Sequence, residues 1–273
     1  QDSNSEIVKE AKSLGIDIKF SHVVVAAKGY KKVKSCDIAE ISEDKQNLNQ
    51  IKNIECDCIC VSGFWTPTVH LASQSGGKTK FKEEIDAFVP DKSKQKEVTL
   101  GSANGVFTLE ETLKTSFDKG FELSKEITNN NNSQQIPKVS EKKHSKHDKF
   151  WCVPLPKGKK YKRFLDFQND VAVSDIELAI REGYRSIEHV KRYTTLGMAT
   201  DQGKTSNLNG LQLVSNIENK VVPAVGHTTF RPPYTPISIG AIVGREIGKH
   251  SKPTRKSPMH NWHEKNNAVF VDA

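Results

Sequence analysis

A long polar segment does most to limit how this chain can fold. Residues 126–149 hold four consecutive asparagines, two glutamines and alternating lysine, histidine and serine, with almost no apolar side chain. Such a segment buries too little apolar surface to overcome its conformational entropy, so it is expected to be a linker or an exposed loop. We therefore predict two folded parts joined by a polar linker at 126–150. His144 and His147 in this linker lack a third ligand and are interpreted as solvated residues rather than as a metal site.

Composition favours a globular protein over a membrane or nucleic-acid-binding one. Hydrophobic residues make up 35% of the 273 residues, and apolar runs such as 23–27 are far shorter than the roughly 18 to 20 residues of a membrane helix. The formal charge of +8 would suit a nucleic acid, but most of the excess lies in solvated lysine-rich stretches such as 157–163, without a recognition motif. We predict no nucleic-acid partner and no membrane span. No initiator Met or signal sequence opens the chain, and its alternating cysteines suit a reducing setting, so we expect a cytoplasmic piece of a longer protein.

The N-terminal part has the pattern of an α/β domain. Apolar residues at helical spacing predict a helix over 5–14, closed by Gly15. Runs of β-branched residues then predict short strands at 16–20, 23–25 and 54–61. Gly29 and the polar stretch 42–53 are expected to break these strands.

A glycine turn follows the next apolar stretch. Val98–Leu100 is predicted as a strand, 101–105 as a turn and 109–120 as a helix, because Leu109, Leu113 and Phe117 recur at helical spacing. Glycines beside small residues let a ligand approach the backbone, and unpaired N–H groups at a helix start favour an anion such as a pyrophosphate.

Three short helices are expected after the linker. The first begins with a capping box between Ser174 and Glu177 and ends near Gly183. The second begins at Ser186, with Ile187 and Val190 buried and Lys191 and Arg192 facing outward; the third begins at 205–207, with Leu208, Leu211 and Val214 buried. This module holds little material for a core of its own, so we expect it to dock on a larger body. The Pro-rich and Thr-rich stretch 228–236 is expected to be extended.

Three further patterns are interpreted as structural. Gly203-Lys204-Thr205 copies the end of a phosphate-binding P-loop, but five residues rather than four separate Gly197 from Gly203, so we reject a P-loop. Cys56, Cys58 and Cys60 alternate and are expected to be buried in the sheet rather than to bind a soft metal. His260 and His263 lack further ligands and are expected to pack or to shape a turn.

Several strings together resemble the α subunit of heterotetrameric sarcosine oxidase. They are Ser62–Leu71, the turn at 101–105, Phe164–Val171, Glu188–Asn207 and Thr228–Pro236. The resemblance covers most of the chain except the polar linker. It implies an α/β architecture in which residues 1–125 are the C-terminal part of an FAD/NAD(P)-binding Rossmann-like domain. Residues 151–220 would be a small helical domain, 221–253 an extended connector and 254–273 the start of an aminomethyltransferase-like, folate-binding domain.

The helical domain resembles the bacterioferritin-associated-ferredoxin fold, whose relatives hold a [2Fe-2S] cluster with four cysteines. In this chain Asp166, Gln168, Asp201 and Ser206 occupy the four ligand places. The spacing is kept, but cluster iron requires thiolates, so we predict no iron–sulfur cluster and no other metal.

The resemblance also implies a reaction and its cofactors. The family oxidises the N-methyl group of sarcosine at a flavin in the β subunit, passes electrons through FMN at the α–β boundary to oxygen, and gives glycine, hydrogen peroxide and 5,10-methylenetetrahydrofolate. Tetrahydrofolate would bind beyond this piece, the partners would be the β, γ and δ subunits, and we expect no catalytic residue in this piece and no activity from it alone. The alternatives are the α subunit of a related amine, opine or proline dehydrogenase, or a non-enzymatic basic binding module.

The expected cofactor-binding residues fall in two groups. NAD is expected at the glycine turn, lined by Ser102, Ala103, Asn104, Gly105, Thr108 and Leu109. The FMN phosphate is expected at a second group that offers a cation and hydroxyls, namely Thr200, Gln202, Lys204, Thr205 and Ser206.

Overall fold

The computed structural model describes residues 5–63, 65–128, 139, 150–251 and 255–270. It divides into two compact units, Gln1–Tyr234 and Thr235–Ala273, and the division falls inside the predicted connector. Most of the predicted linker, with His144 and His147, lies outside the described residues. Each unit is described by itself below.

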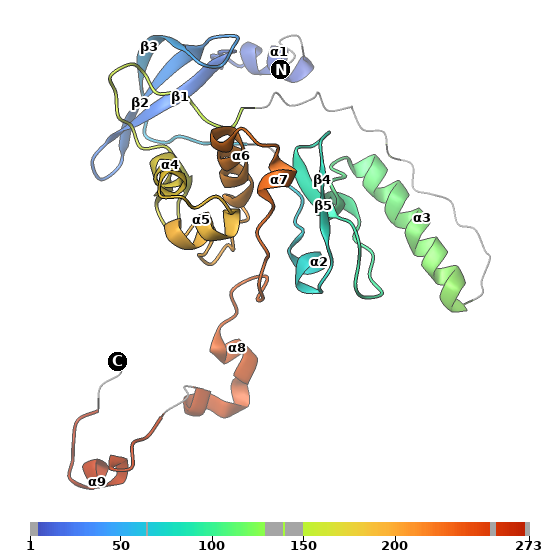
Figure 1. Ribbon diagram of the computed structural model, residues 1–273, viewed down its shortest axis with the longest axis vertical. Helices are drawn as coiled ribbons and strands as arrows, with labels where there is room; N and C mark the ends of the chain where they lie inside the picture. The colour runs from blue at the N-terminus through green and yellow to red at the C-terminus, as the bar shows by residue number, and fades with distance from the viewer. Residues whose placement is uncertain (1–4, 64, 129–138, 140–149, 252–254, 271–273) are drawn as a thin grey trace. The chain divides into compact units, whose positions relative to one another are not determined.

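The chain begins with a helix and a three-stranded antiparallel sheet (Figure 1). The predicted first helix is confirmed as α1 (Glu6–Ser13), in which the Ser5 hydroxyl accepts the Val8 N–H at 3.4 Å. β1 (His22–Gly29) pairs with β2 (Val33–Ile41), and β2 pairs with β3 (Leu48–Glu55).

One carboxylate joins the three strands. Asp37 of β2 accepts hydrogen bonds from Lys28 Nζ of β1 and from Asn53 Nδ2 of β3, each at 2.8 Å. The hydrogen bond from Lys28 lowers the pKa of Asp37, so this buried group stays charged and paired.

The strand predictions were partly wrong. Residues 16–20 form no strand, and the predicted strand at 54–61 ends at Glu55. The polar stretch 42–53, expected to break the sheet, instead supplies most of β3, because pairing with β2 satisfies its backbone and its side chains remain exposed. Each strand pairing in the described residues is antiparallel.

A short hairpin and two helices complete the part before the linker. α2 (His70–Gln74) precedes β4 (Thr79–Lys82) and β5 (Ala87–Pro90), which pair so that Phe81 faces Phe88. The 3₁₀ turn η1 (Gly101–Asn104) then leads to α3 (Leu109–Thr128). The predicted turn and helix are confirmed, but Val98–Leu100 is not a strand and the helix continues through Gly120.

After the linker the chain forms a compact helical module. β6 (Phe164–Asp166) pairs with β7 (Val171–Ala172), and four helices follow. These are α4 (Val173–Arg181), α5 (Ile187–Thr194), α6 (Asn207–Glu218) and α7 (Val222–Val225). The predicted capping box between Ser174 and Glu177 was wrong by two residues. The helix is capped at Ala172, whose N–H donates to Asp175 Oδ2 at 2.8 Å.

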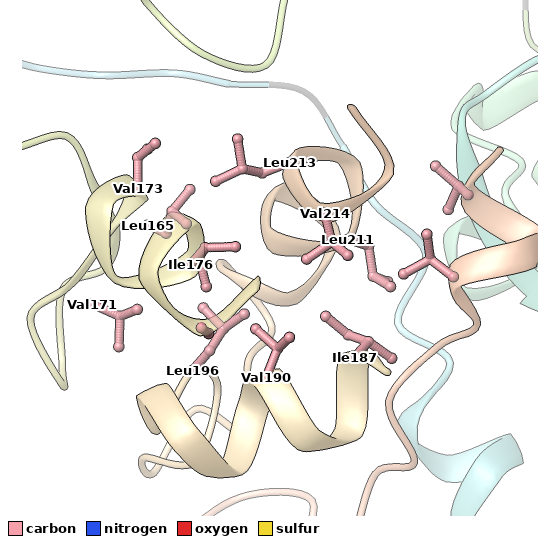
Figure 2. Close-up of a cluster of buried hydrophobic side chains, with 13 residues drawn as sticks. Leu165, Val171, Val173, Ile176, Ile187, Val190, Leu196, Leu211, Leu213 and Val214 are labelled. Atoms are coloured by element: carbon pink, nitrogen blue, oxygen red, sulfur yellow. The ribbon is translucent and has the colours of Figure 1, made fainter. Parts of the chain in front are cut away.

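The main hydrophobic core lies inside this module (Figure 2). Side chains from α4, α5 and α6 point toward one another, with Ile176, Val190, Leu196 and Val214 fully buried. The module therefore has a core of its own, contrary to expectation, although Phe81 and Phe88 of the hairpin pack against its edge. Leu208 and Lys191 also differ from expectation, since Leu208 is only partly buried and Lys191 is half-buried rather than facing outward.

The second unit contains three short helices. These are α8 (Ile239–Val243), η2 (Arg245–Ser251) and α9 (His260–Lys265). As expected, the two histidines of α9 pack, His260 against the Phe270 ring at 4.8 Å and His263 edge-on to Trp262 at 5.2 Å. Across the described parts of both units, each helix is too short or too polar to cross a membrane.

Candidate functional site

Two loops of the helical module lie against each other. The first is the turn between β6 and β7, and the second, the Lys204 loop, spans 197–206 between α5 and α6. Asp166 Oδ2 accepts the Gly197 N–H at 2.8 Å, and Gln168 Oε1 accepts the Asp201 N–H at 3.3 Å. The predicted proximity of these two segments is therefore confirmed.

Three of the four residues predicted to occupy the cluster-ligand places, Asp166, Gln168 and Asp201, use their side chains to hold the loops. Asp166 Oδ1 also accepts the N–H of Gln168 at 2.9 Å, and Asp201 Oδ1 accepts the N–H of Gly203 at 3.0 Å. Ser206 is fully buried, and its hydroxyl has no hydrogen-bond partner. None of the four residues is a cysteine, and both carboxylates are engaged by backbone N–H groups, so the set offers no thiolate and no free carboxylate to cluster iron.

Lys204 is the one charged side chain of the predicted FMN group. Its ammonium donates to the Tyr234 carbonyl oxygen at 2.6 Å and lies 4.2 Å from the centroid of the Tyr234 ring. The structure pairs Lys204 with no carboxylate among the residues it describes. A half-buried cation whose partners are a carbonyl and an aromatic face retains the capacity to bind an anion.

The polar side chains around Lys204 are engaged within the module. Thr200 Oγ1 donates to Gln168 Oε1 at 3.2 Å, Thr205 Oγ1 to Asp201 Oδ2 at 3.0 Å, and Gln202 Nε2 to the Ala199 carbonyl at 3.1 Å. The structure thus brings the predicted FMN residues into one loop, with Lys204 as its available donor.

The predicted NAD residues lie on one turn with different exposures. Ser102 and Leu109 are exposed, Ala103, Asn104 and Thr108 are half-buried, and Gly105 is buried. Gly105 has φ +74°, and a Cβ there would come within 2.6 Å of Ile85 Cδ1, so any other residue would strain the backbone and displace the Ile85 side chain. Asn104 alone of the group lines a neighbouring pocket of about 210 Å³, which also includes Lys78, Lys92 and Glu97.

A second pocket of about 50 Å³ lies beside Lys204. It is lined by residues of several segments: Thr66, Pro67, Val69, His70, Phe88, Gly203, Lys204, Asn207, Leu208, Leu211, His227, Thr228 and Phe230. We call it the His70 cavity. Residues far apart in the sequence thus meet at one wall of the helical module.

His70 is the unusual group of this cavity. Its side chain is 3% exposed, its ring stacks on Phe230 with 3.7 Å between centroids, and neither ring nitrogen has a hydrogen-bond partner. Burial, reinforced by the charge of Lys204, lowers the pKa of His70 to about 4, and the nearby Gln202 carbonyl opposes this shift without reaching hydrogen-bond geometry. The imidazole is therefore neutral at physiological pH.

His70 was not among the residues predicted to bind a cofactor. Its only signal was a histidine beside Val69, Leu71 and Ala72, which indicates burial but not the partners that burial brings. Those partners come from segments around Lys204 and Phe230, more than a hundred residues further along the chain.

The cysteine prediction was wrong. Cys58 and Cys60 follow the end of β3, are exposed, and have their sulfur atoms 3.8 Å apart. Cys56 is only half-buried. Within the described residues, no three His, Cys, Asp or Glu side chains are grouped so as to hold a metal ion.

Comparison with known proteins shows which proteins this chain is similar to. Residues 160–245, which contain both loops, match the family described as the sarcosine oxidase A3 domain. The chain is 38% identical to sarcosine oxidase subunit alpha of Rhizobium meliloti (strain 1021), over 92% of this chain and 24% of that protein. The corresponding subunit of Corynebacterium sp. (strain P-1) is 33% identical, over 98% of this chain and 28% of that protein. The chain is related to a part of sarcosine oxidase subunit alpha.

The chain spans about a quarter of the length of these sarcosine oxidase subunits. In three dimensions it resembles the crystal structure of L-proline dehydrogenase from P. horikoshii with a TM-score of 0.60, over 88% of this chain and 48% of that one. At 19% identity this similarity concerns the fold alone, and it agrees with the mixed α/β class predicted from the sequence.

Proposed function

We propose that this chain is part of the α subunit of a heterotetrameric sarcosine oxidase and that it binds cofactors rather than reacting with substrate. The observation that carries this proposal is the relationship to sarcosine oxidase subunits over almost the whole chain. It is supported by Lys204, which lies in the loop expected to hold FMN and is bonded to the Tyr234 carbonyl rather than to a carboxylate among the described residues. The partners would be the β, γ and δ subunits. Residues 1–125 would belong to a dinucleotide-binding domain, 151–220 to the cluster-less helical domain and 254–273 to the start of a folate-binding domain.

The residues present fit a flavin phosphate at the Lys204 loop. Lys204 supplies the cation. Thr200, Gln202 and Thr205 of the same loop would exchange their present hydrogen bonds for the phosphate, and the Ser206 hydroxyl is buried without a partner. A bound flavin would supply the electron transfer. The role of this chain is to neutralise and orient the phosphate with a charge-assisted hydrogen bond. The sulfur-free set at Asp166, Gln168, Asp201 and Ser206 does not fit an iron–sulfur cluster, and no step is assigned to one.

FMN occupancy of the assembled complex tests this role. The chain, within its full-length subunit, is co-expressed with the β subunit, and flavin released by denaturation is quantified against protein. Lys204→Ala should lower FMN occupancy severalfold, while Lys160→Ala, which removes an exposed lysine, should leave it unchanged. Equal occupancy in both variants would contradict the assignment.

NAD is proposed at the glycine turn. Ser102, Ala103, Asn104 and Gly105 would approach the pyrophosphate, with Thr108 and Leu109 behind them, and Asn104 adjoins the 210 Å³ pocket. Asn104→Asp should weaken NAD binding because it adds negative charge beside a pyrophosphate, whereas Asn267→Asp, in the second unit, should not. Equilibrium dialysis with NAD distinguishes the two variants.

A further inference from the structure

Two buried ring nitrogens in the His70 cavity have no hydrogen-bond partner among the described residues. His70 is almost fully buried, lines the cavity, and has no partner for either ring nitrogen. Leaving such a group unpaired costs about 1–3 kcal/mol, and buried polar groups in native proteins are nearly always bonded to protein, water or ligand. A partner for His70 is therefore expected inside the cavity.

The other histidine of the cavity, His227, has a hydrogen-bond partner for each ring nitrogen. His227 Nδ1 lies 2.9 Å from the Thr228 carbonyl oxygen, which can only accept, so Nδ1 carries the proton. His227 Nε2 then accepts from Thr79 Oγ1 at 2.9 Å. The chain thus provides both partners for His227 and neither for His70, although both rings line the same space.

Two positive charges and one negative charge act on His70, so the net charge around it is positive. Lys204 lines the cavity and Lys191 lies on α5, and both favour the neutral imidazole; Asp201, on the Lys204 loop, is the one carboxylate that opposes them. Asp201 is already engaged by Gly203 N–H and Thr205 Oγ1. A ligand that offsets this net positive charge would itself be negatively charged.

Donors and space then limit the ligand. The Thr228 hydroxyl oxygen accepts from Asn207 Nδ2 at 3.0 Å, so its own proton remains available, and it is joined by one His70 N–H and by the Lys204 ammonium. The rest of the lining is largely apolar, with Phe88, Phe230 and Leu211 among it. A cavity of about 50 Å³ holds about three or four atoms besides hydrogen, since one water needs about 10–15 Å³.

We propose that the His70 cavity binds a small monocarboxylate of the size of formate or acetate, held by His70, Thr228 and Lys204. Two carboxylate oxygens can accept from the donors of these three residues, which all line the cavity, and its small volume excludes longer acids. This inference does not depend on the proposed oxidase function, because it concerns a ligand of the chain itself.

An NMR titration of the native chain tests the proposal. Histidine ring resonances are followed at pH 6.5 while sodium formate, acetate, benzoate or chloride is added at constant ionic strength. Formate and acetate should move the His70 resonance to saturation, and saturating formate should raise the pKa of His70 by about one unit or more. Benzoate and chloride should leave it in place. A His70 resonance that does not move with formate, or that moves equally with chloride, overturns the proposal.

Variants make the same test independent of the resonance assignment. His70→Phe keeps the ring that stacks on Phe230 but removes both nitrogens, so formate should no longer raise its melting temperature. Lys204→Met should weaken formate binding at least about tenfold. His189→Phe changes an exposed histidine of α5 and should bind formate like the native chain. Undiminished formate stabilisation of His70→Phe contradicts the site, and if that variant does not fold, the native titration decides. FMN occupancy is measured separately, so failure of either proposal is recognised on its own.

Discussion

The Gly197 N–H donates a hydrogen bond of 2.8 Å to Asp166 Oδ2, although the two residues lie 31 positions apart. Asp166 is 2% exposed, and its other oxygen accepts the N–H groups of Gln168 and Asn169 at 2.9 and 3.2 Å. A single carboxylate thus fixes both loops of the helical module.

Asp166→Ala should lower the free energy of unfolding by about 2–4 kcal/mol, because it removes three charge-assisted hydrogen bonds and leaves the buried Gly197 N–H without an acceptor. Urea denaturation measures the change. Asp170→Asn, at an exposed turn residue with φ +53° that asparagine tolerates, should change the stability by less than about 0.5 kcal/mol. Similar losses for both variants would contradict a special role for Asp166.

A second prediction concerns Gly203, whose backbone in the Lys204 loop is left-handed. Gly203 has φ +73°, and a Cβ there would lie 2.2 Å from the Asn207 side chain. Gly203→Ala should therefore cost at least about 2 kcal/mol, since steric overlap adds to the strain of a left-handed residue.

Gly183 provides the matched control. It has φ +96° but no atom within 4 Å of the built Cβ, so Gly183→Ala should show backbone strain alone, about 1 kcal/mol. Thermal or urea unfolding of the two variants separates overlap from strain, and equal losses would mean that Asn207 moves aside.

The sequence predicted correctly those helices whose own residues show helical spacing of apolar side chains and signals at the helix ends. The helices α1, α5 and α6 have apolar spacing and end signals in their own sequence, and the family resemblance placed Asp166 and Gln168 beside the Lys204 loop. β3 was missed because its strand state comes from pairing with β2 rather than from its polar residues. His70 was missed for a similar reason, since its burial and its lack of partners arise only when α2, the Lys204 loop and Phe230 meet.

The low pKa of His70 gives the stability a pH dependence with a defined sign. The pKa is 6.5 for the ordinary group and about 4 in the fold, so between these values the unfolded chain binds the proton that the folded chain excludes. The contribution of neutral His70 is complete above pH 6.5 and is lost as the pH falls toward 4, by up to about 1.4 kcal/mol per unit.

His70→Phe removes this titration, so the stability difference between the variant and the native chain should grow in favour of the variant by on the order of 2–3 kcal/mol from pH 7 to pH 4. Urea denaturation across this range, in buffers free of small carboxylates, measures it. Parallel curves for the two proteins would show that His70 titrates normally.

Two glycines within helices test packing against helix propensity. Gly210 lies in α6 against Leu196, and a Cβ there would come within 2.4 Å of Leu196 Cδ2; Gly120 lies in α3 with no atom within 4 Å. Alanine is favoured over glycine by about 1 kcal/mol in a helix, so Gly120→Ala should stabilise the chain by about 0.5–1 kcal/mol.

Gly210→Ala should instead destabilise the chain by about 1–3 kcal/mol, because overpacking in a core exceeds the gain in propensity. Adding Leu196→Val, which shortens the opposing side chain, should restore part of the loss, and the double-mutant cycle measured by urea denaturation gives the coupling between the two positions. Additive effects would mean that Leu196 is not the group that keeps position 210 a glycine.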